Sequence, residues 1–353
     1  MFTRILFILI VSVFCMAIPL NAQTLNVPTL SSDYAILIDA YTGKVLYEKN
    51  ADSKAYPAST TKILTLITVL ENNNRNEIIT VSTKAASMEG STCYLKAGEK
   101  YAFSDMLYGM MLPSGNDASV ALAEHIASNI DNFSKLMNST ANMIGAKNSN
   151  FVNPSGLPDE NHYTTARDMS IIARYAMQNR AFREIVSTER FIWPRKNDKQ
   201  PNTLKNTNEI LGNFFGANGI KTGYTKAAKK CLVVSAKRKD MELIAVFFHS
   251  VQDCWEDGRS LLQYGFDIVT PKTIYKSGDT VRTVPVYKSD KQAILTVKED
   301  IILPIVDDYD KYKIEFITVK RLFAPVVNDQ EAGTIKIFYN GLEIKKVKLF
   351  VKE

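Results

Sequence analysis

A serine and a lysine three positions apart, Ser59 and Lys62, lie in the stretch PASTTKIL, where a turn passes into an apolar run. On a helix, positions i and i+3 share a face, so both side chains would point into one cleft. The lysine can act as general base for the serine if burial and a neighbouring cation lower its pKa from about 10.4 toward 7. A serine in this position is also a common helix N-cap, and S-x-x-K arises by chance about once or twice in a chain of this size. The pair alone therefore leaves both interpretations open.

Two further short motifs carry reactive or polar side chains. Ser114 and Asn116 lie in LPSGND, a Pro/Gly turn before a helical run, where either residue can also serve as a helix cap. Lys221, Thr222 and Gly223 lie in NGIKTGYT, ahead of a strand-rich region. On an edge strand, this lysine and threonine suit recognition of a carboxylate, and the glycine lets a ligand approach the backbone.

The elements that must position these motifs include both strands and helices. Residues 34–50 predict a hairpin, because two β-rich runs flank a turn rich in Asp, Thr and Gly. Residues 59–71 predict a helix that is apolar on nearly every face and is therefore buried. We also expect helices from Asp117 and from about Thr165, two core strands joined by a charged turn over 229–250, and a closing helix over 257–269.

The chain changes character near residue 270, where short alternating runs are separated by Gly, Asp and Asn turns. We therefore expect one domain over residues 23–269 and a small all-β, β-sandwich-like domain over residues 270–353. The triplet KSG in YKSGDT resembles KTG, but it falls after this change and predicts a turn. The ending GLEIKKVKLFVKE alternates apolar and basic residues and predicts a final strand, with no basic amphipathic helix after it.

Residues 1–22 have the layout of a secretory signal peptide: one positive charge at Arg4, an apolar run from Ile5 to Leu20, and a small residue at Ala22. The run of 16 residues is short for a bilayer span of about 20. We expect an extracytoplasmic, secreted protein, with membrane attachment only through an uncleaved N-terminus.

The bulk composition excludes several classes of protein. The net charge of +6 is spread along the chain rather than concentrated in a basic stripe, so we expect no nucleic-acid partner. No Cys/His spacing suggests a metal site, and we expect neither metal nor cofactor. Cys93, Cys231 and Cys254 are interpreted as buried small side chains, with a single Cys231–Cys254 bridge left open.

Other hydrolase chemistries fit poorly. The chain has three histidines and no G-x-S-x-G elbow, which disfavours a Ser-His-Asp hydrolase, and it lacks the H-E-x-x-H of zinc peptidases. His125, within an apolar helical run, and His249, after a core strand, are interpreted as packed residues.

Taken together, S-x-x-K, S-x-N and K-T-G occur in this order at a helix start, a turn and a strand. With the surrounding segments DAYTGKVLYEKNADSKAYPASTTKILT, LYGMMLPSGNDASVALAEHI and GIKTGYTKAAKKCLVVSAKR, residues 32–269 resemble the low-molecular-mass penicillin-binding proteins of the peptidase S11 family, the serine-type D-alanyl-D-alanine carboxypeptidases. The resemblance implies an α+β fold: a β-lactamase/transpeptidase-like domain, an antiparallel sheet with packed helices, followed by the small all-β domain.

The resemblance also implies roles for the three motifs. Ser59 would be the acylated nucleophile and Lys62 its general base, Ser114 would relay a proton to the leaving group, and Asn116 would hydrogen-bond the substrate amide. The substrate would be the D-Ala-D-Ala end of a peptidoglycan stem peptide, and β-lactams would acylate the same serine.

Substrate binding would fall to the third motif. Lys221 and Thr222, with Gly223, would bind the terminal carboxylate, and the backbone N–H groups of Ser59 and Tyr224 would form the oxyanion hole. His162, in the family-typical run HYTTARD, is interpreted as structural, with Thr164 or Thr165 as a helix cap.

Alternatives on the same fold remain. A β-lactamase would need a deacylating E-x-x-L-N run, which is absent. A DD-endopeptidase or transpeptidase would use the same acyl-enzyme, and a non-catalytic penicillin sensor would have lost the chemistry. The resemblance implies a cell-wall-associated enzyme.

Overall fold

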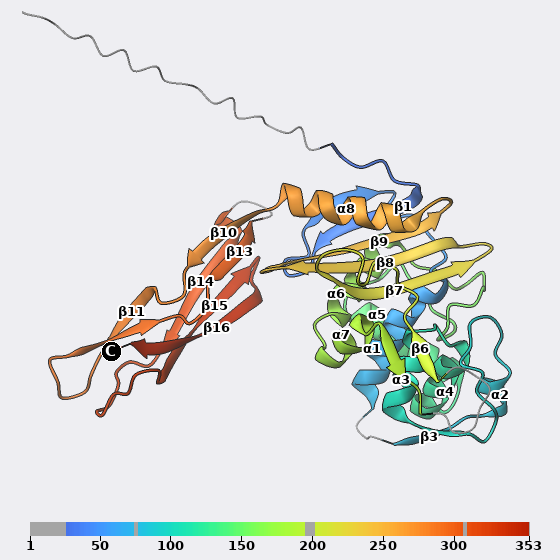
Figure 1. Cartoon of the computed structure of the whole chain (residues 1–353), viewed down its shortest axis with the longest axis horizontal. Helices are drawn as coiled ribbons and strands as arrows, with labels where there is room; N and C mark the ends of the chain where they lie inside the picture. The colour runs from blue at the N-terminus through green and yellow to red at the C-terminus, as the bar shows by residue number, and fades with distance from the viewer. Residues whose placement is uncertain (1–25, 74–76, 195–201, 306–308, 353) are drawn as a thin grey trace, which may run out of the picture.

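The computed structural model describes residues 26–73, 77–194, 202–305 and 309–352. The chain forms a sheet-and-helix part, followed by an all-β part that extends away from it (Figure 1). The expected α+β fold is confirmed. The expected signal segment, residues 1–22, lies outside the described residues.

The central sheet of the first part has five antiparallel strands in the order β2-β1-β9-β8-β7. Its strands are β1 (Ser32–Asp39), β2 (Val45–Lys49), β7 (Ala217–Thr225), β8 (Lys229–Arg238) and β9 (Met241–Ser250). The predicted hairpin is therefore β1 and β2, and the predicted pair of core strands is β8 and β9. The K-T-G motif lies on β7, at the edge of the sheet.

Both faces of this sheet are covered, as Figure 1 shows: α8 (Cys254–Ile268) lies on one face, and the other helices lie on the opposite face. Because successive strand residues point to opposite faces, Leu243 and Phe247 of β9 pack with α8, whereas Ile244 and Phe248 join the core on the other side. This two-sided burial explains why the strands read as continuous apolar runs.

The buried helix α1 forms the centre of the helical layer. The remaining elements of this part are η1 (Ala58–Thr61), α1 (Lys62–Asn72), β3 (Ile78–Thr80), α2 (Thr83–Ala86), β4 (Lys100–Ala102), α3 (Phe103–Met111), α4 (Asn116–Ala127), α5 (Ile130–Met143), α6 (Ala166–Ala176), α7 (Arg180–Ser187), β5 (Arg190–Ile192) and β6 (Thr203–Lys205). Helices α3, α4, α5, α6 and α7 all contact α1, which explains its apolar surface on nearly every side. The helix was expected to begin near Ser59, but residues 58–61 form a 3-10 turn before it.

Of two helix caps considered from the sequence, one is present and the other is not. Thr165 caps α6, since its hydroxyl accepts a hydrogen bond from the N–H of Asp168 at 3.0 Å, as expected. The N-cap of α4 is Gly115, and no side chain caps that helix. The interpretation of Ser114 or Asn116 as a cap is therefore wrong.

The all-β part has an apolar core of its own. Its elements are β10 (Thr270–Tyr275), β11 (Thr280–Pro285), β12 (Gln292–Thr296), β13 (Ile301–Ile305), η2 (Tyr309–Lys311), β14 (Tyr312–Thr318), β15 (Glu331–Tyr339) and β16 (Leu342–Lys352), in sheets ordered β10-β13 and β11-β12-β16-β15-β14. The predicted final strand is β16, with Val347, Leu349 and Val351 buried. The KSG triplet lies in a turn between β10 and β11, where Gly278 has a φ of +86°.

Cysteine and histidine positions follow the predictions in part. Cys93, Cys231 and Cys254 are buried and unbridged, so the disulfide left open by the sequence is not formed. His125 packs near Phe103 and pairs with Glu77, but the side chain of His249 is 35% exposed and pairs with Asp33. The interpretation of His249 as a packed residue is wrong, because His249 is the next-to-last residue of β9, where the strand ends near solvent.

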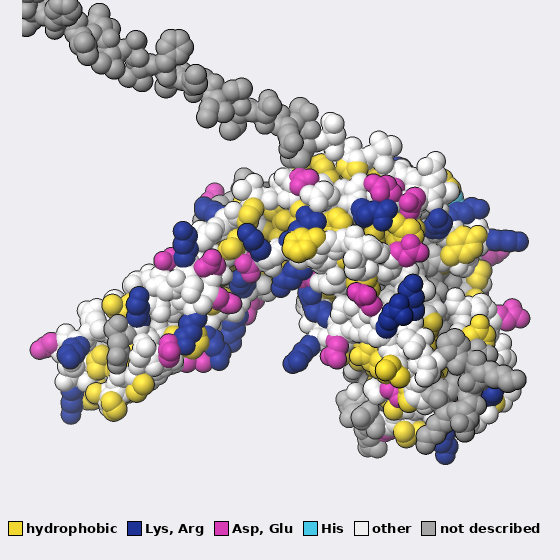
Figure 2. Space-filling view, viewed as in Figure 1, with side chains coloured by type: hydrophobic (Ala, Val, Ile, Leu, Met, Phe, Trp, Pro, Cys, Tyr) yellow, Lys and Arg dark blue, Asp and Glu magenta, His cyan; other side chains and the backbone are white. Residues whose placement is uncertain are grey.

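The surface carries both signs of charge. Figure 2 shows positive and negative side chains interspersed over the viewed face of both parts of the chain. No helix within the described ranges is long and apolar enough to cross a membrane.

Candidate active site

The serine of the first motif is presented by a tight turn. Ala58 has a φ of +47°, and the hydroxyl of Thr60 donates to the carbonyl of Pro57 at 2.7 Å, which closes the 3-10 turn η1. A non-glycine residue at positive φ is a strained conformation of the kind found at functional sites. The turn leaves Ser59 partly exposed, while its neighbours are buried.

Two glycines hold this turn between a loop and the sheet edge. A Cβ at Gly156, which has a φ of +84°, would lie 1.8 Å from the carbonyl oxygen of Ala58. A Cβ at Gly223 on β7 would lie 2.8 Å from the backbone nitrogen of Ser59. Gly223 was expected to give a ligand access to the backbone, which stays a prediction; its missing side chain also makes room for the serine turn.

Lys62 has three oxygen neighbours. Its Nζ lies 3.1 Å from Ser59 Oγ, 2.7 Å from Asn116 Oδ1 and 2.8 Å from the carbonyl oxygen of Ser155. An amide oxygen and a carbonyl oxygen only accept hydrogen bonds, so they take two N–H donors. A neutral amine has two N–H groups and one lone pair, and the lone pair is thus left to face the hydroxyl of Ser59.

The orientation of Asn116 is fixed by the protein. Its Nδ2 donates to the carbonyl oxygen of Glu89 at 2.6 Å, which turns Oδ1 toward Lys62. The side chain is buried, and both ends of the amide contact protein groups. Asn116 therefore orients the lysine, and its expected hydrogen bond to a substrate amide stays a prediction.

The electrostatics favour a neutral lysine. Burial lowers the pKa of Lys62 well below its usual value, and the charge of Lys221 lowers that pKa further, against a smaller opposite effect of Asp117. Burial also lowers the pKa of Lys221, to about 7. The second cation that the sequence-based argument required is thus the lysine of the K-T-G motif.

Ser114 offers an unengaged hydroxyl. Its φ is +68°, and its buried Oγ has no hydrogen-bond partner among the residues that the structure describes. Buried polar groups without partners are uncommon in native proteins, and this one lines the groove that contains Ser59.

The groove has a volume of about 370 Å³. Four residues of the predicted site other than Ser114 line it: Ser59, Thr222, Gly223 and Tyr224. Lys221 is buried behind Thr222, and its Nζ donates to the carbonyl oxygen of Thr222 at 3.1 Å. The structure thus brings all three motifs together, with the hydroxyls in the groove and the lysines behind it.

Two contributors to the site lie outside the three motifs. Ser155 supplies a backbone carbonyl to Lys62 because Asn153 Oδ1 accepts from the backbone N–H groups of residues 155–157 and fixes that loop. Thr207 places its hydroxyl 2.7 Å from that of Thr222. The segment NPSGL contains turn-forming residues from which this loop could have been predicted, but no sequence signal points to Thr207.

His162 supports the same loop, as its structural interpretation requires. Its Nδ1 accepts from the N–H of Val152 at 3.1 Å, so its Nε2 carries the proton and donates to Thr61 Oγ1 at 2.8 Å. Burial lowers the pKa of His162 to about 4, which keeps the ring neutral. Over the described ranges, no cluster of three or more His, Cys, Asp or Glu side chains could hold a metal ion.

Comparison with known proteins identifies related chains. Residues 21–251 match the family described as D-alanyl-D-alanine carboxypeptidase (Peptidase S11), and residues 270–353 match the C-terminal domain of penicillin-binding protein 5. D-alanyl-D-alanine carboxypeptidase DacF of Bacillus subtilis (strain 168) is 36% identical over 90% of this chain and 84% of its own length. DacC of Escherichia coli (strain K12) is 30% identical over 94% of this chain and 86% of its own.

Solved structures agree with these sequence matches. Penicillin-binding protein 5 from Haemophilus influenzae has a TM-score of 0.64 and 30% identity, over 93% of this chain and 98% of that one. The Streptomyces K15 DD-transpeptidase has a TM-score of 0.65 and 32% identity, over 69% of this chain and all of that one.

The fold and the site together define a penicillin-binding type of serine enzyme with a lysine beside its nucleophile. More narrowly, the chain belongs to the peptidase S11 family of serine-type D-alanyl-D-alanine carboxypeptidases.

Proposed function

We propose that the protein removes the terminal D-alanine from peptidoglycan stem peptides through an acyl-enzyme on Ser59. The observation that carries this proposal is the arrangement at Lys62, whose Nζ contacts Ser59 Oγ and two carbonyl-type acceptors. In the neutral amine these two acceptors take both N–H groups and leave the lone pair for the proton of Ser59. The names of the relatives support the reaction and the substrate class.

Acylation begins when Lys62 Nζ takes the proton of Ser59 and the alkoxide attacks the carbonyl of the penultimate D-alanine. The N–H groups of Ser59 and Tyr224 stabilise the oxyanion, and one such donor contributes about 10²–10³ in rate. The hydroxyl of Ser114 passes the proton from Lys62 to the nitrogen of the leaving D-alanine, whose carboxylate is bound by Lys221 and Thr222.

Deacylation reverses these proton transfers with water in place of D-alanine. Lys62 takes a proton from water, the hydroxide attacks the ester carbonyl, and Ser59 regains its proton. A β-lactam enters by the same first step, since its strained amide presents a carbonyl and a carboxylate to the same groups.

We place the enzyme outside the cytoplasm, exported by residues 1–22 and associated with the cell wall. The apolar run of 16 residues near the N-terminus and the peptidoglycan substrate support this location. We also propose that residues 23–269 form the catalytic domain and residues 270–353 a separate domain, which is supported by the separate core of the latter.

Release of D-alanine from a synthetic peptide ending in D-Ala-D-Ala tests the proposal. The wild type should release D-alanine, and Ser59→Ala should abolish release. Ser91→Ala, which removes another hydroxyl from the wall of the groove, should retain release. Equal release by Ser59→Ala and wild type would refute the role of Ser59.

A further inference from the structure

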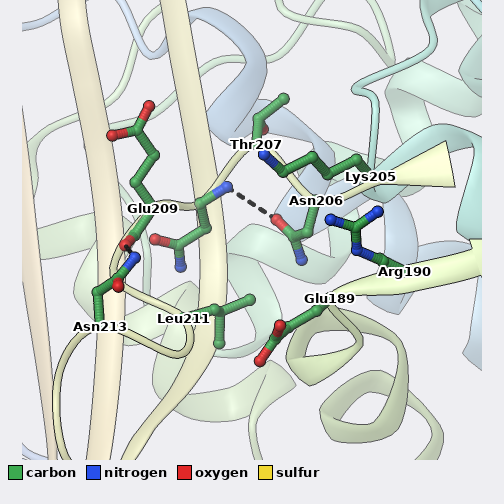
Figure 3. Close-up of a pocket in the computed structure, with 9 residues that line it drawn as sticks. Glu189, Arg190, Lys205, Asn206, Thr207, Glu209, Leu211 and Asn213 are labelled. Atoms are coloured by element: carbon green, nitrogen blue, oxygen red, sulfur yellow. Dashed lines mark hydrogen bonds between the residues drawn. The ribbon is translucent and has the colours of Figure 1, made fainter.

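A second cavity lies beyond one end of the active-site groove. It has a volume of about 450 Å³ and is formed by residues 189–190, 205–209, 211 and 213; we call it the hairpin pocket, after the β5–β6 hairpin that supplies one wall (Figure 3). Thr207 lines both the groove and this pocket. Its hydroxyl lies 2.7 Å from that of Thr222, the residue proposed to bind the terminal carboxylate. The hairpin pocket therefore opens on the leaving-group side of the scissile bond.

Two cations face each other across the hairpin. Arg190 of β5 and Lys205 of β6 are direct cross-strand partners. Like charges in this position destabilise a sheet unless something neutralises them. Neither side chain has an ion pair within the described part of the chain. An anion bound in the pocket would relieve their repulsion.

A buried donor in the wall also lacks an acceptor. Asn208 is 3% exposed, and its Oδ1 accepts from the N–H of Ile210 at 3.1 Å, which fixes the orientation of the amide. Its Nδ2 has no hydrogen-bond partner among the described residues. Because buried amides are normally paired, this N–H₂ group is suited to an oxygen acceptor that arrives with a ligand.

The acidic residues of the pocket do not neutralise these donors. In Figure 3 the Lys205 side chain extends toward Thr207, whereas the carboxylate of Glu189 points away from Arg190 and that of Glu209 points away from the hairpin. Lys205 thus extends toward the residue that joins this pocket to the groove, and Arg190 and Asn208 line the same pocket.

We propose that the hairpin pocket is a leaving-group subsite that binds a side-chain carboxylate of the departing residue. The enzyme would then release not only D-alanine but also D-amino acids with acidic side chains. The chemistry is the reaction already proposed: the C–N bond to the leaving residue breaks, its nitrogen takes the proton, and Ser59 keeps the acyl group. The inference therefore rests on the proposed function.

Three peptides that differ only in the last residue, D-Ala, D-Glu or D-Gln, test the subsite. D-Gln has the size and shape of D-Glu without its charge. We expect kcat/KM for release of D-Glu to exceed that for D-Gln by about five- to tenfold at low salt, and this ratio to fall as salt screens the cations. A wild-type ratio near one at low salt would overturn the subsite without any variant.

The double variant Arg190→Gln with Lys205→Gln adds a second arm. We expect it to bring the D-Glu/D-Gln ratio to about one while release of D-Ala stays at the wild-type rate. The matched control, Lys135→Gln with Lys147→Gln, removes two exposed charges elsewhere and should keep the ratio. A ratio that survives in the Arg190/Lys205 variant would overturn the subsite. Normal release of D-Ala without preference for D-Glu refutes the subsite alone, whereas no release of D-Ala by the wild type refutes the proposed function as well.

Discussion

Replacing Gly223 by alanine should slow acylation of Ser59 with little effect on the fold. A Cβ at this position would lie 2.8 Å from the backbone nitrogen of Ser59 and 3.1 Å from the carbonyl oxygen of Pro57. Both are backbone atoms, so no side-chain rotation relieves the contact. Gly223 does not have a positive φ, and the effect therefore comes from space rather than from backbone strain.

The size of the effect follows from the geometry. Ordinary contacts begin at 3.4 Å, so β7 and the turn must separate by about 0.6 Å at the nitrogen proposed as an oxyanion donor. A misplacement of about 1 Å can slow a reaction by about 10²-fold, and loss of one oxyanion donor by about 10²–10³-fold. We expect acylation to slow by about 10²-fold, with a loss of about 1–3 kcal/mol in unfolding free energy from overpacking.

The assay is the second-order rate constant for acylation by a fluorescent penicillin, together with urea unfolding. The matched control is Gly265→Ala, whose Cβ would lie 2.7 Å from side-chain atoms of Leu243 and Leu37 on the α8 face of the sheet. We expect the control to lose stability but keep the wild-type acylation rate. A folded Gly223→Ala protein that acylates as fast as wild type would refute the reasoning.

Three further predictions follow from buried charges. The pH profile of kcat/KM with a D-Ala-D-Ala peptide should fall at low pH as Lys62 is protonated, and fall again above about pH 7 as Lys221 loses its charge. Lys221→Gln should remove the fall at high pH. The same variant should move the fall at low pH to a higher pH, because the charge of Lys221 helps to lower the pKa of Lys62. Arg183→Met leaves the fully buried carboxylate of Glu242 without its ion pair. Because Arg183 is about one-third exposed, the unfolding free energy measured in urea should fall by an amount near the lower end of the range of about 3–5 kcal/mol. A fall of less than about 1 kcal/mol would contradict this expectation. Asp257→Asn replaces a carboxylate that accepts four hydrogen bonds from Ser31 and Ser32, at the start of β1. The unfolding free energy should therefore fall by about 1.5–3 kcal/mol, while the rate of acylation by penicillin stays unchanged. Slower acylation would contradict this expectation and would show that α8 affects the site.

The sequence predicted the elements of the site because their signals are local. Alternating and continuous apolar runs marked the strands of the sheet, and residues 59–71 marked the buried helix α1. The start of that helix was misplaced, since the positive φ of Ala58 and the 3-10 turn depend on Gly156 and Gly223, which are distant in sequence.

The function of individual site residues depended on contacts that no local pattern records. Any residue can supply a backbone carbonyl, so the acceptor at Ser155 has no sequence signature. Asn116 holds Lys62 in place because its amide also donates to a carbonyl 27 residues away in sequence, a contact that no motif predicts. Thr207 and Thr222 are 15 residues apart in sequence, and only the folded chain brings their hydroxyls together.

The central claim is that Ser59 is the residue acylated and that Lys62 activates it. Intact-mass measurement after incubation with a penicillin tests it most directly, followed by peptide mapping of the adduct. We predict one adduct, located on Ser59, which is absent from Ser59→Ala and forms far more slowly in Lys62→Gln. An adduct on another serine, or one that persists in Ser59→Ala, would contradict the account.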